Sequence, residues 1–386
     1  MKEDSNYKVL GGQGAQQTLK SVLESFRIYN VLLKAFWKGE VNMPRLPVYR
    51  KKGGLALITY PSQAISFDLE TGDCLLPISR ELNQDVNNDL GLNEIRIKGC
   101  FCLHIYQIAE VMIIPQYQQF YAEYVYQKKL SQPSKLDYSL ELGIDHGVTN
   151  WLTCLSNQGQ SFIVDGRKLK AINQGYNRQF AQIKQGKLAK YWDDTLSKIT
   201  DKRNNQSRDA VNKPARFVIN YCLNHKIGNI VFGWNTGNKY SIKIGKKNNQ
   251  NFVQITTARL KKIIEELCYY YGIVFTETEE SYNSKSSFID HDLLPKFGEK
   301  PASMKFSGRR INRGLYQTKT MQKINADAQG AANILKKVKA QLNLNLVKVC
   351  RGYLIVPKRY DLSKKLNKLY PKRCESMFLI TLTTTA

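Results

Sequence analysis

The stretch LELGIDHGVTNWLTCLS (residues 140–156) decides the fold class, because two apolar runs flank a polar break. With QSFIVDG (160–166), these runs predict consecutive strands. The residues that follow predict a mostly helical, basic region over 170–225, a buried strand over 227–235, a helix over 251–272, a strand over 273–282 and a last helix from near Asn325. Strands followed by alternating helices and strands are typical of an α/β domain with a mixed sheet.

The N-terminal part of the chain has a different pattern. Residues 9–37 carry apolar side chains at helical spacing, and Pro44 and Pro47 end the predicted helix. Between about 48 and 127 the pattern changes to short alternating runs with turn-rich breaks, which predict a small antiparallel sheet or barrel. The polar segment 127–137, with a central proline, is interpreted as a linker.

Composition and charge limit the class of protein. A chain of 386 residues that is 42% hydrophobic can build a real core, which excludes a disordered chain. The net charge of +26 favours a polyanionic partner, with nucleic acid ahead of an anionic membrane surface. No apolar stretch reaches the roughly 18–20 residues of a membrane span, and the N-terminus has no apolar signal core. We therefore expect a soluble, cytoplasmic and nucleoid-associated protein with no membrane contact.

The eight cysteines form no CxxC pair, which argues against a zinc ribbon and against a disulfide scaffold. Cys100, Cys102 and His104 alternate along one run, so a strand would place them on one face. That spacing favours a packed sheet face over a metal site.

Three acidic positions stand out in this basic chain. Asp145 ends an apolar run, where a carboxylate either belongs to a hairpin turn or needs a partner such as Mg²⁺. Glu277, Glu279 and Glu280 crowd the end of the 273–282 strand, either as a solvated strand end or as a group whose repulsion a cation relieves. Asp327 begins the last helix, where the helix dipole alone favours an acid.

Together, these acids predict a hydrolytic site. The separations along the chain allow one acid from each position to meet at one end of the sheet, and convergent Asp, Glu and Asp residues are what two-metal phosphodiester hydrolysis requires. His146 is a weaker candidate, because neighbouring residues of a strand face opposite ways.

Several motifs, in this order, resemble the TnpB (OrfB) family of insertion-sequence proteins, often labelled transposases and related to type V CRISPR effectors. They are LGIDHGVTN (142–150), KKNNQNFVQ (246–254), TEESYNSKSSF (278–288), FSGRRINRGLY (306–316) and INADAQGAANIL (324–335). The resemblance implies an RNase H-like (RuvC) nuclease domain over 139–340. It also implies a helical recognition segment over 1–40, N-terminally short for the family, a β-rich oligonucleotide-binding domain over 41–138 and a basic C-terminal tail over 341–386.

The resemblance further implies an RNA-guided, metal-dependent DNA endonuclease that uses a guide RNA from the transposon end and a target DNA. Asp145 and Asp327 match the first and third catalytic acids. The family's usual second acid would fall at Gly233, so Glu280 is assigned this role, with Glu279 second. Asp145, Glu280 and Asp327 are then expected to hold two Mg²⁺ ions, for which Mn²⁺ can substitute. Residues 281–326 contain no Cys, so no structural zinc is expected.

Positive clusters beside these acids predict phosphate binding rather than a merely solvated surface. The candidate nucleic-acid-binding residues are Arg203, Arg208, Arg216, Lys239, Lys246, Lys247, Asn249, Gln250, Asn251, Lys285, Lys305, Arg309, Arg310 and Arg313. Two functional alternatives remain at this point: a cleavage-deficient RNA-guided DNA-binding protein, such as a repressor or a decayed remnant, and a guide-independent RuvC-type nuclease. The oligomeric state is left open.

Overall fold

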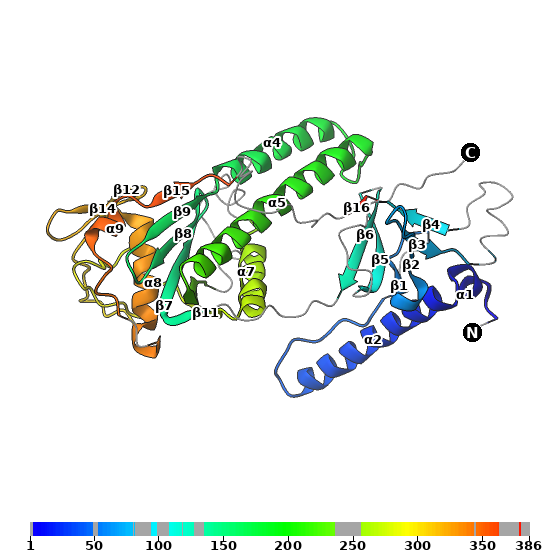
Figure 1. Cartoon of the computed structure of the whole chain (residues 1–386), viewed down its shortest axis with the longest axis horizontal. Coiled ribbons are helices and arrows are strands. Elements are labelled where there is room, and N and C mark those ends of the chain that lie inside the picture. Colours follow the sequence, from blue (N-terminus) through cyan, green and yellow to red (C-terminus); the bar gives the residue numbers. More distant parts are fainter. Residues whose placement is uncertain are drawn as a thin grey trace. The chain divides into compact units, whose positions relative to one another are not determined.

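The structure is a computed structural model that describes residues 3–48, 53–79, 81, 94–98, 108–117, 119–126, 135–235, 256–342, 345–362 and 378–379. The chain divides into two compact units. One comprises Met1–Lys129 with Leu369–Ala386, and the other comprises Leu130–Lys368. Figure 1 follows the course of the chain through both units. Among the described residues, no helix is long and apolar enough to cross a membrane.

The first unit contains the predicted N-terminal helix and short strands. The helix forms as α1 (Ser5–Leu10) and α2 (Gly12–Trp37), which meet at a glycine. One sheet has the strand order β1 (Ile58–Pro61), β5 (Ile108–Gln116), β6 (Gln119–Tyr126) and β16 (Phe378–Leu379). A second sheet has the strand order β2 (Ser66–Phe67), β3 (Cys74–Pro77) and β4 (Glu94–Ile97). The described strands thus form two small antiparallel sheets. Cys100, Cys102 and His104 lie outside the described residues.

The second unit has the sheet that the sequence predicts. Its strands are β7 (Asp137–His146), β8 (Asn150–Ser156), β9 (Ser161–Asp165), β10 (Ile227–Gly233), β11 (Val274–Thr278) and β15 (Lys358–Tyr360), in the order β11-β10-β7-β8-β9-β15. The pairs β7–β8 and β8–β9 are antiparallel, whereas β10 runs parallel to both β7 and β11. The sheet therefore has an antiparallel run on one side of β7 and parallel strands on the other, so the prediction of an α/β domain with a mixed sheet is confirmed for this unit.

Helices cover both faces of this sheet and create two cores. Leu142 and Ile144 of β7 belong to the core formed with α5 (Asp194–Asn224) and α7 (Thr257–Tyr271). The intervening β7 residues Gly143 and Asp145 face α8 (Ala326–Leu342), which packs over the opposite core. Figure 1 shows α8 beside β7 and shows α4 (Arg167–Lys184) paired with α5. Strand alternation therefore places the last acid of β7 under the start of α8.

The segment after β11 forms structure that the sequence does not predict. It contains a three-stranded antiparallel sheet of β12 (Arg309–Asn312), β13 (Leu315–Gln317) and β14 (Lys323–Asn325). Beyond α8, helix α9 (Arg351–Ile355) and β15 also belong to the second unit, whereas β16 pairs with β6 in the first. The segment 341–386, predicted as a separate basic tail, is therefore divided between the two units.

Candidate active site

The three predicted acids line one cleft of about 830 Å³ in the second unit. Asp145 reaches it from the carboxyl end of β7, and its carboxylate lies directly against α8. A Cβ atom added at Gly330 of α8 would lie 2.9 Å from Asp145 Oδ2. Only a residue without a side chain fits at this close approach, so Gly330 allows α8 to cover the Asp145 carboxylate.

Glu280 enters the cleft from the turn that follows β11. Its backbone N–H donates a 2.9 Å hydrogen bond to Asn235 Oδ1, just beyond β10. A Cβ atom at Gly233 would lie 2.9 Å from Glu280 Oε1. The Glu280 carboxylate therefore lies in the space that a side chain at position 233 would occupy, which is where the family resemblance leads one to expect the second acid.

Asp327 enters from the first turn of α8. Asn325 Oδ1 accepts hydrogen bonds of 3.0 Å from the backbone N–H groups of Asp327 and Ala328 and so holds the start of the helix. The two Asp327 carboxylate oxygens have different partners. Asn150 Nδ2 donates to Oδ2 at 2.6 Å, and Arg310 Nη2 lies 3.3 Å from Oδ1.

The electrostatics of the cleft are those of crowded carboxylates. Desolvation raises the pKa of Asp145 well above its usual value, the charges of Glu280 and Asp327 raise it further, and Arg310 opposes the rise. Burial raises the pKa of Glu280 to about 7, although the charge of Lys337 and a hydrogen bond from the His146 backbone favour the ionised form. The cleft therefore favours a bound proton or cation at neutral pH.

The neighbouring acids are engaged elsewhere. Glu279 is held by Lys337, whose Nζ donates to Glu279 Oε1 at 2.9 Å and to its carbonyl oxygen at 3.1 Å. Glu277 forms an ion pair with Lys261. β11 ends at Thr278, one residue before the first of the two adjacent glutamates, and of these two only Glu280 lines the cleft.

His146 also lines the cleft, in spite of its adjacent position to Asp145 on the strand. Its Nε2 lies 3.5 Å from Glu280 Oε1, and its ring packs near Phe232 and Trp234. Neighbouring residues within a strand face opposite ways, but His146 is the last residue of β7, so its side chain can still line the cleft.

The donor set of the cleft is that of a site for a hard divalent cation, since carboxylate oxygens are preferred ligands of Mg²⁺. Glu280 Oε1 is buried and accepts no hydrogen bond from the described residues; only His146 Nε2, at 3.5 Å, forms an ion pair with it among them, and a cation would satisfy it. Asp327, however, is turned to Asn150 and Arg310. In the described part of the chain, no three His, Cys, Asp or Glu side chains are grouped so as to hold a metal ion. The residues present fit Mg²⁺ by their chemistry, and Asp327 would need to release Arg310 to complete the ligand set.

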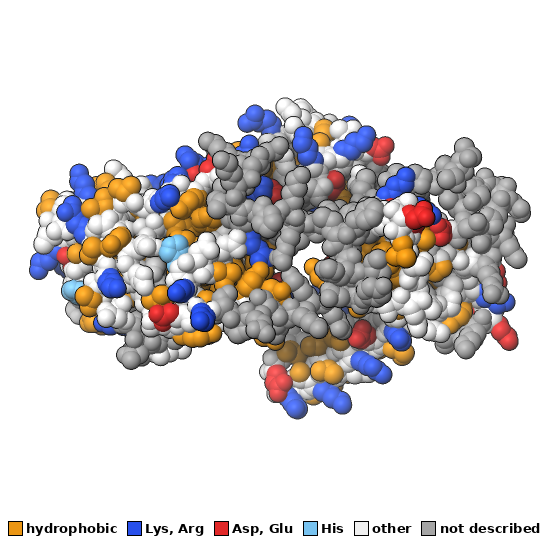
Figure 2. All heavy atoms as spheres, viewed as in Figure 1, with side chains coloured by type: hydrophobic (Ala, Val, Ile, Leu, Met, Phe, Trp, Pro, Cys, Tyr) orange, Lys and Arg blue, Asp and Glu red, His pale blue; other side chains and the backbone are white. Residues whose placement is uncertain are grey.

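The predicted nucleic-acid-binding residues fall into four groups. Arg310 and Arg313 line the cleft, whereas Lys285, Lys305 and Arg309 are exposed and do not. On α5, Arg203 donates to Asn173 and Arg216 donates to Tyr271, so both have internal partners, and Arg208 is half-buried. The remaining candidates lie outside the described residues: Lys239, Lys246, Lys247, Asn249, Gln250 and Asn251. Figure 2 shows Lys and Arg side chains predominating over acids on the visible face around β12 and β14.

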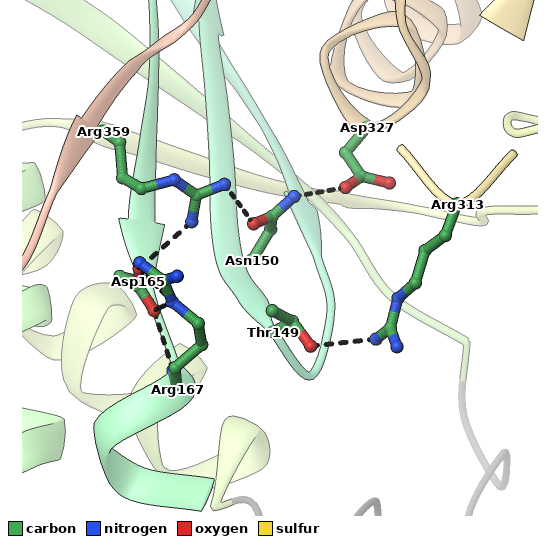
Figure 3. A network of polar contacts seen from close by, with 7 residues as sticks. All are labelled: Thr149, Asn150, Asp165, Arg167, Arg313, Asp327 and Arg359. Carbon is green, nitrogen blue, oxygen red and sulfur yellow. Dashed lines mark hydrogen bonds and ion pairs between the residues drawn. The ribbon is translucent and has the colours of Figure 1, made fainter. Parts of the chain in front are cut away.

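Several other residues of the cleft carry no role in the sequence interpretation, including four with polar or charged side chains: Thr149, Asn150, Asn283 and Arg359. Figure 3 shows that Thr149 accepts a hydrogen bond from Arg313, at 2.8 Å, and that Arg359 donates to Asn150. Thr149, Asn150 and Asn283 lie within quoted motifs. Arg359, by contrast, has no local signal, because only the folded sheet brings it to the cleft.

Comparisons with known proteins give a family match over part of the chain. No curated protein matches the chain. The solved complex of Cas12f1 with sgRNA and target DNA is similar to it at 16% identity over 83% of this chain and 70% of that chain, with a TM-score of 0.45. A CRISPR-Cas12f ternary complex is similar at 16% identity over 85% and 71% of the two chains, with a TM-score of 0.37. Residues 123–239 match the OrfB_IS605 family model, described as a probable transposase. Over this part of the chain, the match confirms the resemblance to the TnpB (OrfB) transposase family that the motifs indicate.

Proposed function

We propose that this protein is a transposon-associated, RNA-guided DNA endonuclease that hydrolyses phosphodiester bonds with divalent cations. One observation carries the proposal: Asp145, Glu280 and Asp327, which are far apart in the sequence, line a single cleft together with basic side chains. Such a combination suits a phosphodiester substrate, because the acids suit metal ions and the arginines suit phosphate oxygens.

Each side chain has a stated task in this proposal. Asp145, Glu280 and Asp327 would hold the two Mg²⁺ ions, or Mn²⁺ in their place. When bound, the ions supply the positive charge that activates a water molecule and stabilises the leaving 3′ oxygen. Arg310 and Arg313 extend from the β12–β13 hairpin into the cleft and bind the phosphates that flank the scissile bond. Because Arg310 pairs with Asp327, binding of a phosphate by Arg310 would also release that acid for the metal.

The guided mode of action is supported by charge and by family. A net charge of +26 suits a long nucleic-acid ligand. An RNA–DNA duplex is contacted through its backbone, with sequence left to base pairing, so the protein needs basic side chains rather than base-specific ones. The match of residues 123–239 to a transposase family supports a transposon-derived guide.

The test uses the full chain coexpressed with its native flanking DNA. Copurified RNA is sequenced, and cleavage of a plasmid that matches this RNA is measured with and without Mg²⁺. The proposal expects bound RNA and Mg²⁺-dependent cleavage that Asp145→Asn, Glu280→Gln and Asp327→Asn each abolish. Asp137→Asn is the matched control, because Asp137 begins the same strand at its opposite end and is bonded to Ser139. Cleavage by the three cleft variants at the wild-type rate would refute the proposal.

A cleavage-deficient RNA-guided DNA-binding protein is the second candidate. The observation in its favour is that both carboxylate oxygens of Asp327 are already engaged, by Asn150 and by Arg310. Bound RNA and DNA binding without cleavage would establish this candidate. Cleavage without any bound RNA would instead indicate a guide-independent RuvC-type nuclease.

A further inference from the structure

Strand β15, the last strand of the second unit, extends the sheet of that unit at its outer edge. It pairs in parallel with β9, so that Arg359 lies opposite Ile163. Tyr360, the next residue, packs against Phe217 of the core with ring centroids 4.7 Å apart. Because strand residues alternate between faces, Arg359 points away from that core. Its side chain instead lines the acid cleft.

Arg359 begins a chain of hydrogen bonds that ends on a predicted catalytic acid (Figure 3). Its Nη1 lies 3.2 Å from Asp165 Oδ2, and its Nη2 donates to Asn150 Oδ1 at 2.7 Å. Asn150 Nδ2 then donates to Asp327 Oδ2 at 2.6 Å. Burial alone would raise the pKa of Asp165, but hydrogen bonds from Arg167 and the charges of Arg167 and Arg359 lower it. Asp165 is thus an ionised anchor for the guanidinium group.

The chemistry of these groups fixes which way the Asn150 amide faces. A guanidinium group can only donate hydrogen bonds, and a carboxylate can only accept them. An asparagine between the two must present its oxygen to the arginine and its NH₂ group to the acid. Without Arg359, the Asn150 oxygen would lose this donor, and the amide, held only by Asp327, could move away from its place beside that carboxylate.

We propose that Arg359 is a positioning residue of the cleft, which holds Asn150 in the amide orientation that fixes the Asp327 carboxylate. This inference rests on the proposed nuclease function and adds strand β15 to the nuclease site. It assigns a role to a segment that the sequence suggests is only a basic tail.

The rival explanation is that Arg359 binds a phosphate directly, since its side chain is 40% exposed. The two roles differ in what they require of the side chain. A phosphate contact needs mainly positive charge, which Lys also supplies, whereas bridging Asp165 and Asn150 needs the planar, forked guanidinium group. Arg167 provides a matched control: it donates to the same Asp165, at 2.8 and 3.0 Å, but is not bonded to Asn150.

The experiment compares Arg359→Ala, Arg359→Lys, Asn150→Ala, the double variant Arg359→Ala/Asn150→Ala, and Arg167→Ala in the full chain. Two quantities are measured: the Mn²⁺ affinity of the nucleic-acid-free protein by titration calorimetry, and the single-turnover cleavage rate at several salt concentrations. Outer partners of metal ligands typically contribute about 10–100-fold to metal affinity or activity. We therefore expect about a 10-fold loss for Arg359→Ala, Arg359→Lys and Asn150→Ala, and less than about a twofold change for Arg167→Ala.

The double variant distinguishes the two roles. If Arg359 acts through Asn150, the double variant is no worse than Asn150→Ala alone, because coupled residues are not additive. Additive losses, retained activity in Arg359→Lys, or a cleavage rate that depends less on salt in Arg359→Ala would overturn the inference and identify a phosphate contact. Equal losses in Arg167→Ala would also overturn it. A wild-type protein that neither binds Mn²⁺ nor cleaves refutes the proposed function itself, whereas a competent wild type with an unaffected Arg359→Ala variant refutes only the positioning role.

Discussion

The most direct test of the cleft geometry is Gly233→Ala, a change of one methyl group at the end of β10. The new Cβ atom would lie 2.9 Å from Glu280 Oε1 and 2.5 Å from Ile334 Cδ1, whereas ordinary contact begins at 3.4 Å. Both neighbours are ends of flexible side chains, so they will move. The Glu280 carboxylate must retreat by about 0.5 Å, which is the positional tolerance of a catalytic group.

The expected size of the effect follows from this displacement. A misplacement of about 1 Å can cost on the order of 10²-fold in rate, so half of it is expected to lower single-turnover cleavage about 10-fold, or about 1.4 kcal/mol. Overpacking costs about 1–3 kcal/mol of stability, and replacing a strand glycine returns about 0.5–1 kcal/mol. We therefore expect the free energy of unfolding to fall by only about 1 kcal/mol, which denaturant titration can measure.

Two further variants make this prediction decisive. Gly175→Ala is the control, because a Cβ atom at this helical position has nothing within 4 Å, and it should leave cleavage unchanged. The exchange Gly233→Glu with Glu280→Gly moves the carboxylate to the neighbouring strand and should restore part of the activity that Glu280→Gln loses. Wild-type cleavage by Gly233→Ala, combined with inactive Glu280→Gln, would refute the claim that position 233 must stay empty for Glu280.

Three further predictions concern other contacts of the second unit. Burial raises the pKa of Glu141 from 4.5 to about 7, so between these pH values the folded protein binds a proton that the unfolded chain releases. The free energy of unfolding should therefore fall by on the order of 2 kcal/mol as the pH rises from about 4.5 past 7. Glu141→Gln should flatten this pH profile, which denaturant titrations can measure. Arg310→Ala should raise the Mn²⁺ affinity of the free protein up to about fivefold, since an exposed ion pair contributes about 0.2–1 kcal/mol; an unchanged affinity in calorimetry would show that Arg310 does not compete with the metal. Asp292→Ala removes the acceptor for the backbone N–H groups of Ser287 and Ser307 and should lower the free energy of unfolding by about 2 kcal/mol, with faster proteolysis around Ser307 as the local readout.

Most strands of the second unit could be predicted from the sequence, because the signal for each strand is local. Apolar runs such as LELGID and IGNIVFG correspond to β7 and β10, and the polar residue at the end of a run marks the edge of the sheet. Asp145 and Asp327 could be predicted as site residues for the same reason, since each lies at the boundary of a helix or strand. The preference for Glu280 over Glu279 rests on the family resemblance alone, because the two residues are adjacent; in the structure Glu280 lines the cleft, whereas Glu279 is paired with Lys337.

Contacts between distant segments could not be predicted. Arg359 and Asn150 are 209 residues apart, and Asn150 and Asp327 are 177 apart. No periodicity links such positions. The glycines of the segment FSGRRINRG indicate a loop, but Gly314, with φ of 79°, turns the chain tightly between β12 and β13. The glycine that indicates a loop in the sequence is the residue that permits the hairpin.

The position of the second acid can be understood from the register of the sheet. β10 and β11 are parallel neighbours, and Gly233 pairs with Thr278 at their common carboxyl edge. A carboxylate carried just beyond Thr278 therefore reaches the same space as one carried at the end of β10. Comparison with the family by sequence position alone would suggest that the second acid is missing at Gly233. In the structure, however, the Glu280 carboxylate lies beside Gly233. Gly233 is therefore no argument for a cleavage-deficient protein. The contacts of Asp327 with Arg310 and Asn150 are the feature on which the two functions differ, because a nuclease must release or share them and a DNA-binding remnant need not.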